Sequence, residues 1–93
     1  DSADAPRVSS TKGVHGHLLG AASALEAVIT VIAMNASVLP ATANLDDIDA
    51  QCALRHIPCR ALTDQPVSAA LSFSCGFGGT NVALVFSRYL PPN

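Results

Sequence analysis

Charged side chains are scarce in this sequence. Asp, Glu, Lys and Arg make up 13% of the 93 residues, while 49% are hydrophobic. Ordinary soluble domains carry about 25% charged residues, so this small chain lacks the polar groups to cover its own surface. We therefore predict that much of its surface packs against other polypeptide and that it is a piece of a larger α/β protein. The lack of a methionine at position 1 agrees with this expectation.

Clusters of basic residues are also missing. The formal net charge is -2, and no run of Lys or Arg stands out. Nucleic acids and anionic membrane surfaces attract proteins through such clusters. We therefore expect neither as a partner.

The three cysteines are odd in number and lack the spacing of a disulfide framework. They indicate reduced thiols, and hence the cytoplasm or an organellar matrix such as that of a mitochondrion or plastid. No signal peptide is visible, although a segment from inside a protein could not show one. Cys52, His56 and Cys59 lack a fourth ligand, and the acidic stretch 46–49 lacks the Gly and Glu of a calcium loop. Neither a metal nor another cofactor is expected.

The stretch Leu18–Met34 is apolar or small at almost every position, and Glu26 lies in its middle. A helix that is apolar on every face is either buried on all sides or spans a membrane. This stretch is short for a span, and a carboxylate in hydrocarbon costs about a few kcal/mol. We therefore predict a buried helix between two sheets and no membrane span. The carboxylate needs a cation or N–H partner, and Lys12 is the candidate.

Two apolar runs near the end of the chain predict an antiparallel hairpin over residues 67–88. Residues 67–74 alternate between larger apolar side chains and Ser or Ala, as a strand does. Residues 82–87 are apolar on both faces, which is typical of a buried sheet. The glycine-rich segment Gly76–Asn81 is the predicted turn. Elsewhere we expect a connector over 1–7, a loop over 41–54 and a short extended segment over 54–59 that Pro58 ends.

Two motifs carry the candidate chemistry. The first is Ser9-Ser10-Thr11-Lys12-Gly13-Val14-His15-Gly16-His17-Leu18-Leu19-Gly20-Ala21-Ala22, and the second is Gly76-Phe77-Gly78-Gly79-Thr80-Asn81. A histidine that follows a glycine just before a helix can be aimed into a cavity by the turn. The glycines of the second motif allow bare backbone N–H groups to reach the same place.

Both motifs resemble the C-terminal part of the β-ketoacyl-acyl-carrier-protein synthases, the condensing enzymes of fatty acid and polyketide synthesis. The usual text of that family is S-T-K-x-x-T-G-H-x-x-G-A-A-G-A-x-E-A in the first region and N-S-F-G-F-G-G-T-N in the second. The resemblance runs from about Val8 to Tyr89. It implies the thiolase-like layered αβαβα fold, of which residues 1–93 are only the C-terminal segment. Within it, residues 7–34 are the active-site histidine loop and buried helix.

The resemblance also implies roles for individual residues in a decarboxylative Claisen condensation. That reaction needs a thiolate to hold the acyl group, N–H donors for the enolate oxygen and a second oxyanion hole for the acyl carbonyl. His17 matches a histidine that supplies the enolate donor, and Phe77 matches the gate whose backbone N–H serves the acyl carbonyl. Lys12 matches a family lysine beside the histidine. The supporting positions are Glu26, Gly76, Gly78, Gly79, Thr80 and Asn81.

Simpler interpretations of the same residues remain open. His17 could be a core histidine that bonds a backbone carbonyl, and Lys12 a solvated loop lysine. Gly76–Asn81 could be an ordinary hairpin turn with a core Phe77. A regular helix starting at His17 would place Glu26 about 14 Å along its axis, so Glu26 is given a supporting role only.

The sequence departs from the family text at three positions. His15 stands in place of Thr, Phe73 in place of Asn and Cys75 in place of Phe. Cys75 also resembles the cysteine of the thiolase motif C-x-G-x-G, but thiolases have G-H-P where this chain has Gly16-His17-Leu18. We therefore interpret Cys75 as a buried structural thiol.

The expected function is a 3-oxoacyl-acyl-carrier-protein synthase of which this segment supplies part of the active site. The resemblance places the nucleophilic cysteine upstream, so the segment alone is expected to be inactive. The implied partners are acyl carrier protein, the remainder of the synthase and a second subunit in a dimer. The alternatives are a non-catalytic synthase-like subunit or scaffold and a thiolase-like acyltransferase. The leading hypothesis requires the His17 imidazole and the Phe77 amide to converge on one cleft.

Overall fold

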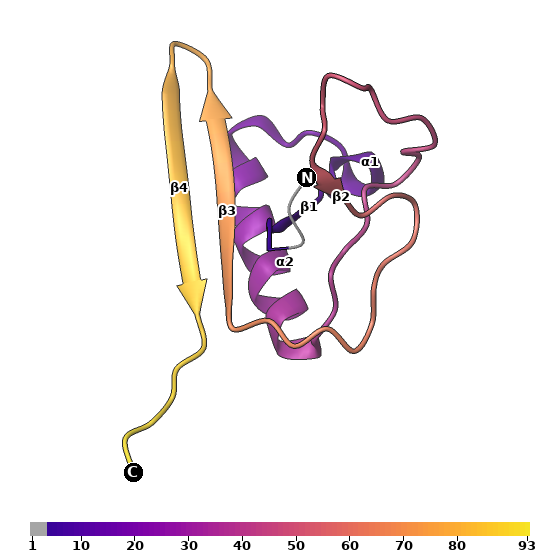
Figure 1. Cartoon of the computed structure of the whole chain (residues 1–93). Coiled ribbons are helices and arrows are strands. Elements are labelled where there is room, and N and C mark those ends of the chain that lie inside the picture. The colour runs from indigo at the N-terminus through magenta and orange to yellow at the C-terminus, as the bar shows by residue number, and fades with distance from the viewer. Residues whose placement is uncertain (1–3) are drawn as a thin grey trace.

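The computed structural model describes residues 4–93 and contains a long helix, an antiparallel hairpin beside it and a looped region on the other side (Figure 1). Seven helical and strand elements follow one another along the described residues. They are β1 (Arg7–Val8), α1 (Lys12–His15), a 3₁₀ turn (Leu19–Ala21), α2 (Ala22–Ala36), β2 (Arg55–His56), β3 (Ala69–Gly76) and β4 (Thr80–Ser87).

The predicted helix is α2, but it begins four residues later and ends two residues later than the apolar stretch suggested. The chain first makes the 3₁₀ turn, so the assumption of a regular helix from His17 was wrong. The helix stops at Ser37, whose φ of 54° is left-handed and whose N–H bonds the carbonyls of Ala33 and Met34. This is a common way for a helix to end.

The prediction that this helix is buried on every face is not met among the described residues. Only Ala22 and Met34 of α2 are buried, whereas Val28 is 54% exposed and Ile32 is 61% exposed. The segment Leu19–Ala36 is long and apolar enough to cross a membrane. However, β3 packs along α2 and Glu26 is paired with Lys12, and both are features of a core helix. The exposed side of α2 is not covered by any other element among the described residues.

The predicted antiparallel hairpin is confirmed. β3 pairs with β4 from Ala69 opposite Ser87 to Gly76 opposite Thr80. The ladder therefore extends into the glycine-rich segment 76–81, and the turn itself is shorter than the predicted range. It consists of Phe77, Gly78 and Gly79, and both glycines have a φ of 86°. Residues with a side chain rarely adopt that conformation, which explains why glycine occupies both positions.

The two faces of β3 differ in an unexpected way. Alternate side chains of a strand point to opposite faces. The half-buried set is Ala70, Ser72 and Ser74, and these small side chains let the helix approach closely. The larger Leu71 and Phe73 are 60% and 58% exposed and belong to the opposite face. The larger apolar side chains of β3 therefore point away from α2 and are uncovered by the described chain, whereas β4 places Val82, Leu84 and Phe86 on the face that turns toward the helix.

The remaining residues form a looped region around the start of the chain. β1 pairs with β2 in parallel, with Arg7 opposite Arg55 and Val8 opposite His56. Arg7 thus belongs to a strand rather than to the predicted connector, while the loop over 41–54 and the short extended segment ended by Pro58 are present as expected. Ile57, which is 3% exposed, is the buried centre of this region.

Arg88 ties the base of the hairpin to the end of α2. Its Nε donates to the carbonyl of Val67 at 2.9 Å, and its Nη2 donates to the carbonyl of Met34. A cation at this position also interacts favourably with the helix C-terminus. Replacing Arg88 with methionine is expected to lower the free energy of unfolding by about 1–3 kcal/mol, because two carbonyls lose a charged donor. Urea denaturation measures this change.

The exposed Arg60 supplies the matched control. Arg60→Met removes the same charge from the loop that follows β2, and it should leave the unfolding midpoint nearly unchanged. Equal destabilisation by the two variants would show that net charge, rather than the tie between hairpin and helix, matters.

Candidate active site

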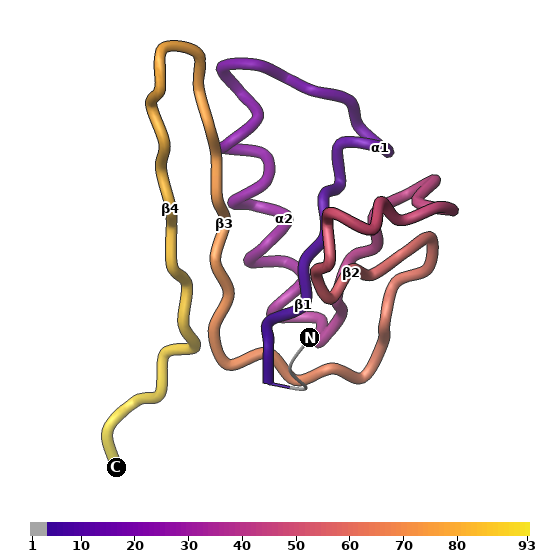
Figure 2. Tube along the Cα trace, turned by 45° about the horizontal axis from the view of Figure 1, so that its top comes forward, coloured from indigo at the N-terminus to yellow at the C-terminus, as the bar shows by residue number. Residues whose placement is uncertain are grey.

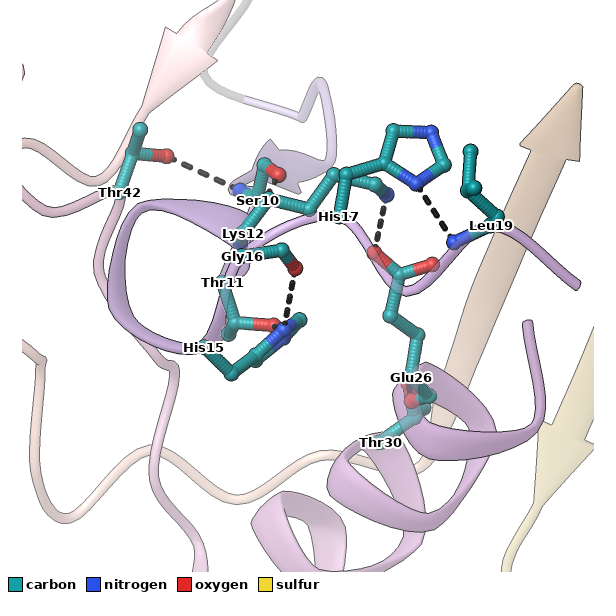
Figure 3. Close-up of polar contacts among 10 residues, drawn as sticks. All are labelled: Ser10, Thr11, Lys12, His15, Gly16, His17, Leu19, Glu26, Thr30 and Thr42. Carbon is teal, nitrogen blue, oxygen red and sulfur yellow. Dashed lines mark hydrogen bonds and ion pairs between the residues drawn. The ribbon is translucent and has the colours of Figure 1, made fainter. Parts of the chain in front are cut away.

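His17 lies in the irregular segment between α1 and α2, and its ring has a defined hydrogen bond. The backbone N–H of Leu19 donates to Nδ1 of His17 at 3.0 Å (Figure 3). Because Nδ1 accepts, the proton of the neutral imidazole must be on Nε2. The ring therefore has one free N–H donor, which is the group that the sequence hypothesis assigned to His17.

Leu19 adopts a backbone conformation that makes this bond. Its φ is 51°, in the left-handed region that residues with a side chain rarely enter. Such a conformation costs about 1–3 kcal/mol and persists only where the surrounding structure holds it. Sequence reasoning missed Leu19, and nothing in its residue type could have revealed this role.

Lys12 and Glu26 form the ion pair that the sequence predicted. Nζ of Lys12, at the start of α1, donates to Oε1 of Glu26, in α2. Figure 3 shows the Glu26 side chain pointing out of α2 toward Lys12 and the segment that carries His17. The side chains of Lys12 and Glu26 are 36% and 15% exposed. The pair thus joins the first motif to the helix, and the simpler interpretation of Lys12 as a solvated lysine is excluded.

The hairpin turn presents Phe77 to the outside, where its side chain is 98% exposed. Both views of the chain place this turn at the end of α2 where the chain enters the helix, the same end as segment 16–21 (Figures 1 and 2). The last part of the first motif and the hairpin turn therefore lie at the same end of α2, whereas α1, which contains the rest of that motif, lies on the side of α2 away from the hairpin (Figures 1 and 2). Thr80 and Asn81, predicted as turn residues, are instead the first two residues of β4.

Two open hollows of the described chain lie away from His17 and Phe77. One open hollow of about 440 Å³ lies between α2 and the end of the hairpin, at Met34, Phe86 and Arg88. Another, of about 460 Å³, lies between α1, α2 and the looped region, at His15, Ile29 and Pro40. Neither is lined by His17 or Phe77. The convergence of His17 and Phe77 on one cleft therefore stays a prediction.

Cys75 is exposed, so its interpretation as a buried thiol was wrong for this chain. It pairs with Asn81 across the hairpin and belongs to the same face as Phe73. Both of these departures from the family text therefore lie on the uncovered face of the hairpin. The described residues do not cover the side chains of Phe73 and Cys75, so the structure assigns them no partner within residues 4–93.

Cys52, His56 and Cys59 take part in local bonds rather than in a cluster. His56 Nε2 donates to the carbonyl of Cys52 at 2.8 Å, and the thiol of Cys59 donates to the Asp46 carboxylate at 3.3 Å. That hydrogen bond, together with desolvation and the carboxylate charge, raises the pKa of Cys59 above its ordinary value. Within residues 4–93, no group of three His, Cys, Asp or Glu side chains is placed to hold a metal ion.

The sequence of the chain is similar to that of known proteins. The family model described as beta-ketoacyl synthase, C-terminal domain, matches residues 1–46. The chain is 48% identical over 81 residues to 3-oxoacyl-[acyl-carrier-protein] synthase 2 of Coxiella burnetii, which covers 87% of this chain and 19% of that protein. It is 49% identical over 84 residues to the protein of the same name from Synechocystis, covering 88% of this chain and 20% of that protein.

A third relative comes from a eukaryote. The chain is 46% identical over 85 residues to a putative mitochondrial 3-oxoacyl-[acyl-carrier-protein] synthase of Schizosaccharomyces pombe, covering 89% of this chain and 20% of that protein. The chain thus spans about a fifth of the length of these curated relatives. The family model covers the first motif of the candidate site and ends before the second.

Proposed function

Because the chain belongs to the β-ketoacyl synthase family, of which it is a C-terminal segment, we propose that it supplies part of the active site of a 3-oxoacyl-acyl-carrier-protein synthase. Such an enzyme condenses an acyl thioester with malonyl-acyl carrier protein in fatty acid synthesis. The observation that carries the proposal is the bond from Leu19 N–H to Nδ1 of His17, which leaves Nε2–H as a fixed donor.

His17 would act when the malonyl group loses carbon dioxide. The bond between the α-carbon and the carboxylate breaks, carbon dioxide leaves, and the electron pair moves into an enolate whose negative charge lies largely on the thioester oxygen. An N–H donor that is already oriented toward this oxygen stabilises the charge without reorganisation. The neutral imidazole of His17 has such a donor in Nε2–H.

Phe77 would serve the other half of the site. An amide at the tip of a glycine turn can donate to the carbonyl oxygen of the bound acyl group, and the exposed ring beside it can cover or uncover the nucleophile. Gly78 and Gly79, with left-handed φ, leave the turn free of side chains next to that ring. Gly76 closes the ladder opposite Thr80. Thr80 and Asn81 would then anchor the turn in the strand.

Lys12 and Glu26 would hold the histidine segment in place. Their ion pair connects α1 to α2 on either side of residues 16–21. A carboxylate that is largely shielded from water keeps its charge most easily beside such a cation. We therefore assign Lys12 to the catalytic site and Glu26 to its support.

The uncovered apolar surfaces favour the thiolase-like layered αβαβα fold for the complete protein. The exposed side of α2 and the outer face of β3 would be covered by the remainder of the synthase, and a second subunit would complete a dimer. Acyl carrier protein would deliver both thioesters. The relatives include bacterial and mitochondrial proteins, and we propose the cytoplasm or an organellar matrix as the compartment.

The test uses the complete protein that contains this segment. Given acyl- and malonyl-acyl carrier protein, it is expected to release carbon dioxide and form 3-oxoacyl-acyl carrier protein, which mass spectrometry of the carrier protein detects. The exposure of Phe73 and Cys75, two departures from the family text, motivates the alternative of a non-catalytic partner subunit. A protein that neither accepts an acyl group nor releases carbon dioxide would favour that alternative.

A further inference from the structure

The first histidine of the motif uses both of its ring nitrogens. Nδ1 of His15 lies 2.7 Å from the carbonyl oxygen of Gly16, and Nε2 lies 2.8 Å from the hydroxyl oxygen of Thr11 (Figure 3). A carbonyl oxygen can only accept, so Nδ1 is the donor. In the neutral imidazole, Nε2 then accepts the hydroxyl proton of Thr11. The ring thus links the start of α1 to the residue that follows this helix.

The Thr11 hydroxyl is committed to this link. Thr11 is the N-cap residue of α1, where a hydroxyl ordinarily bonds a backbone N–H of the first turn, yet its side chain makes no such bond. The carbonyl of Thr11 accepts the backbone N–H of Val14 at 3.0 Å. Thr11 therefore closes the short turn through its backbone carbonyl, and its hydroxyl holds Nε2 of the His15 imidazole.

At its other end the imidazole fixes a peptide plane. The carbonyl oxygen of Gly16 lies in the same rigid plane as the backbone nitrogen of His17. Gly16 has a φ of 82° and a ψ of 177°, and its N–H donates to the carbonyl of Lys12 at 2.8 Å. No atom beyond the two neighbouring residues lies within 4 Å of where its Cβ would be, so packing does not restrain the peptide plane that follows it. The bond from His15 Nδ1 supplies the missing restraint, and it thereby orients the backbone of the next residue.

From these contacts we propose that His15 is a positioning residue for His17, an inference that rests on the proposed function. The imidazole of His17 is then restrained from two sides. Its backbone is oriented by His15 through the peptide plane of Gly16, and its ring is oriented by Leu19 through Nδ1. The sequence signal was the departure from the family text at position 15, where Thr is usual and His stands here.

The experiment compares two half-reactions of the complete synthase. His15→Ala is expected to slow malonyl decarboxylation by about 10- to 100-fold, because misplacing a catalytic group by about 1 Å can cost up to about 100-fold in rate. Acyl transfer to the nucleophilic cysteine, which does not use His17, should be nearly unchanged. His15→Asn keeps a donor near the position of Nδ1, so it should recover most of the lost decarboxylation rate.

Nitrogen NMR of the His17 ring provides a direct readout of its orientation. In the parent protein, Nδ1 and Nε2 should have the separate chemical shifts of a single tautomer. In His15→Ala these shifts should move toward the average of the two tautomers. The His17 signals are assigned by their loss in His17→Ala.

His56→Ala is the matched control, because the half-buried His56, in β2, makes a comparable bond to the carbonyl of Cys52. It should leave decarboxylation within about twofold of the parent rate, because this bond stays within residues 52–56 and does not hold the segment between α1 and α2. An unchanged decarboxylation rate in His15→Ala, or an equal loss of both half-reactions, overturns the positioning role. If instead His17→Ala leaves decarboxylation intact, the proposed function itself fails.

Thr11→Val decides the question if His15→Ala does not fold. This variant keeps the imidazole but removes the hydroxyl that holds Nε2. We expect a several-fold slower decarboxylation with acyl transfer preserved. A parent-like rate in Thr11→Val overturns the proposal.

Discussion

Replacing His17 with alanine is expected to reduce malonyl decarboxylation by about 100- to 1,000-fold, the effect of removing one donor from an oxyanion site. Acyl transfer should remain measurable, because the charge stabilised by Nε2–H of His17 develops only when the malonyl carboxylate leaves. The two rates are measured separately in the complete synthase, by release of labelled carbon dioxide from malonyl-acyl carrier protein and by acylation of the nucleophilic cysteine.

A glutamine at position 17 provides the matched variant. Its side-chain amide places an N–H donor near the position of the imidazole Nε2, but it has no ring nitrogen to accept the N–H of Leu19. His17→Gln should therefore retain part of the decarboxylation rate and lie between the parent and His17→Ala. Undiminished decarboxylation in His17→Ala would contradict the assignment of this histidine, and with it the proposed function.

Replacing Lys12 with methionine is the second change with a large expected effect. It leaves the Glu26 carboxylate, which is 15% exposed, without its cation. A largely shielded charge without a partner costs about 3 kcal/mol or more in stability when it is fully buried, and somewhat less here because Lys12 reaches the surface. Decarboxylation should fall together with stability, because the segment between α1 and α2 loses its anchor. Urea denaturation and carbon dioxide release measure the two effects.

The double variant Lys12→Met/Glu26→Gln separates the pair from the site. Removing both charges leaves no carboxylate to desolvate, so the unfolding free energy should return most of the way to the parent value. If decarboxylation is restored as well, its loss in Lys12→Met came from the unpaired carboxylate of Glu26 and not from a catalytic role of Lys12. If the double variant is no more stable than Lys12→Met, the ion pair is not the source of the destabilisation.

The regular elements could be predicted from the sequence because their patterns are long. The apolar stretch around Glu26 predicted α2, and the alternation over 67–74 predicted β3. The pairing of Lys12 with Glu26 followed from the cost of leaving a carboxylate alone in an apolar helix. In each case the burial of apolar side chains, or the cost of burying an unpaired charge, allowed few arrangements of the chain.

The irregular backbone could not be predicted in the same way. A left-handed leucine at position 19 contradicts the preference of its residue type, and only the tertiary structure shows which N–H it delivers. The exposure of Phe73 could not be predicted either, because alternation shows that a strand has two faces but not which one meets the helix. The roles of His17 and Phe77 were suggested by resemblance, and they stay predictions until the two half-reactions are measured.

The hairpin face that contains Leu71 and Phe73 has a consequence for how variation in this segment is interpreted. Solvent accessibility normally identifies the positions where substitutions are tolerated. Large apolar groups that the chain leaves uncovered are interior positions of the assembled protein in our proposal, so polar substitutions there should be as harmful as those at Ile57. Tolerance in this segment should therefore follow side-chain chemistry rather than accessibility, and the safest positions for a probe or tag are exposed acidic residues of the loop over 41–54, such as Asp47.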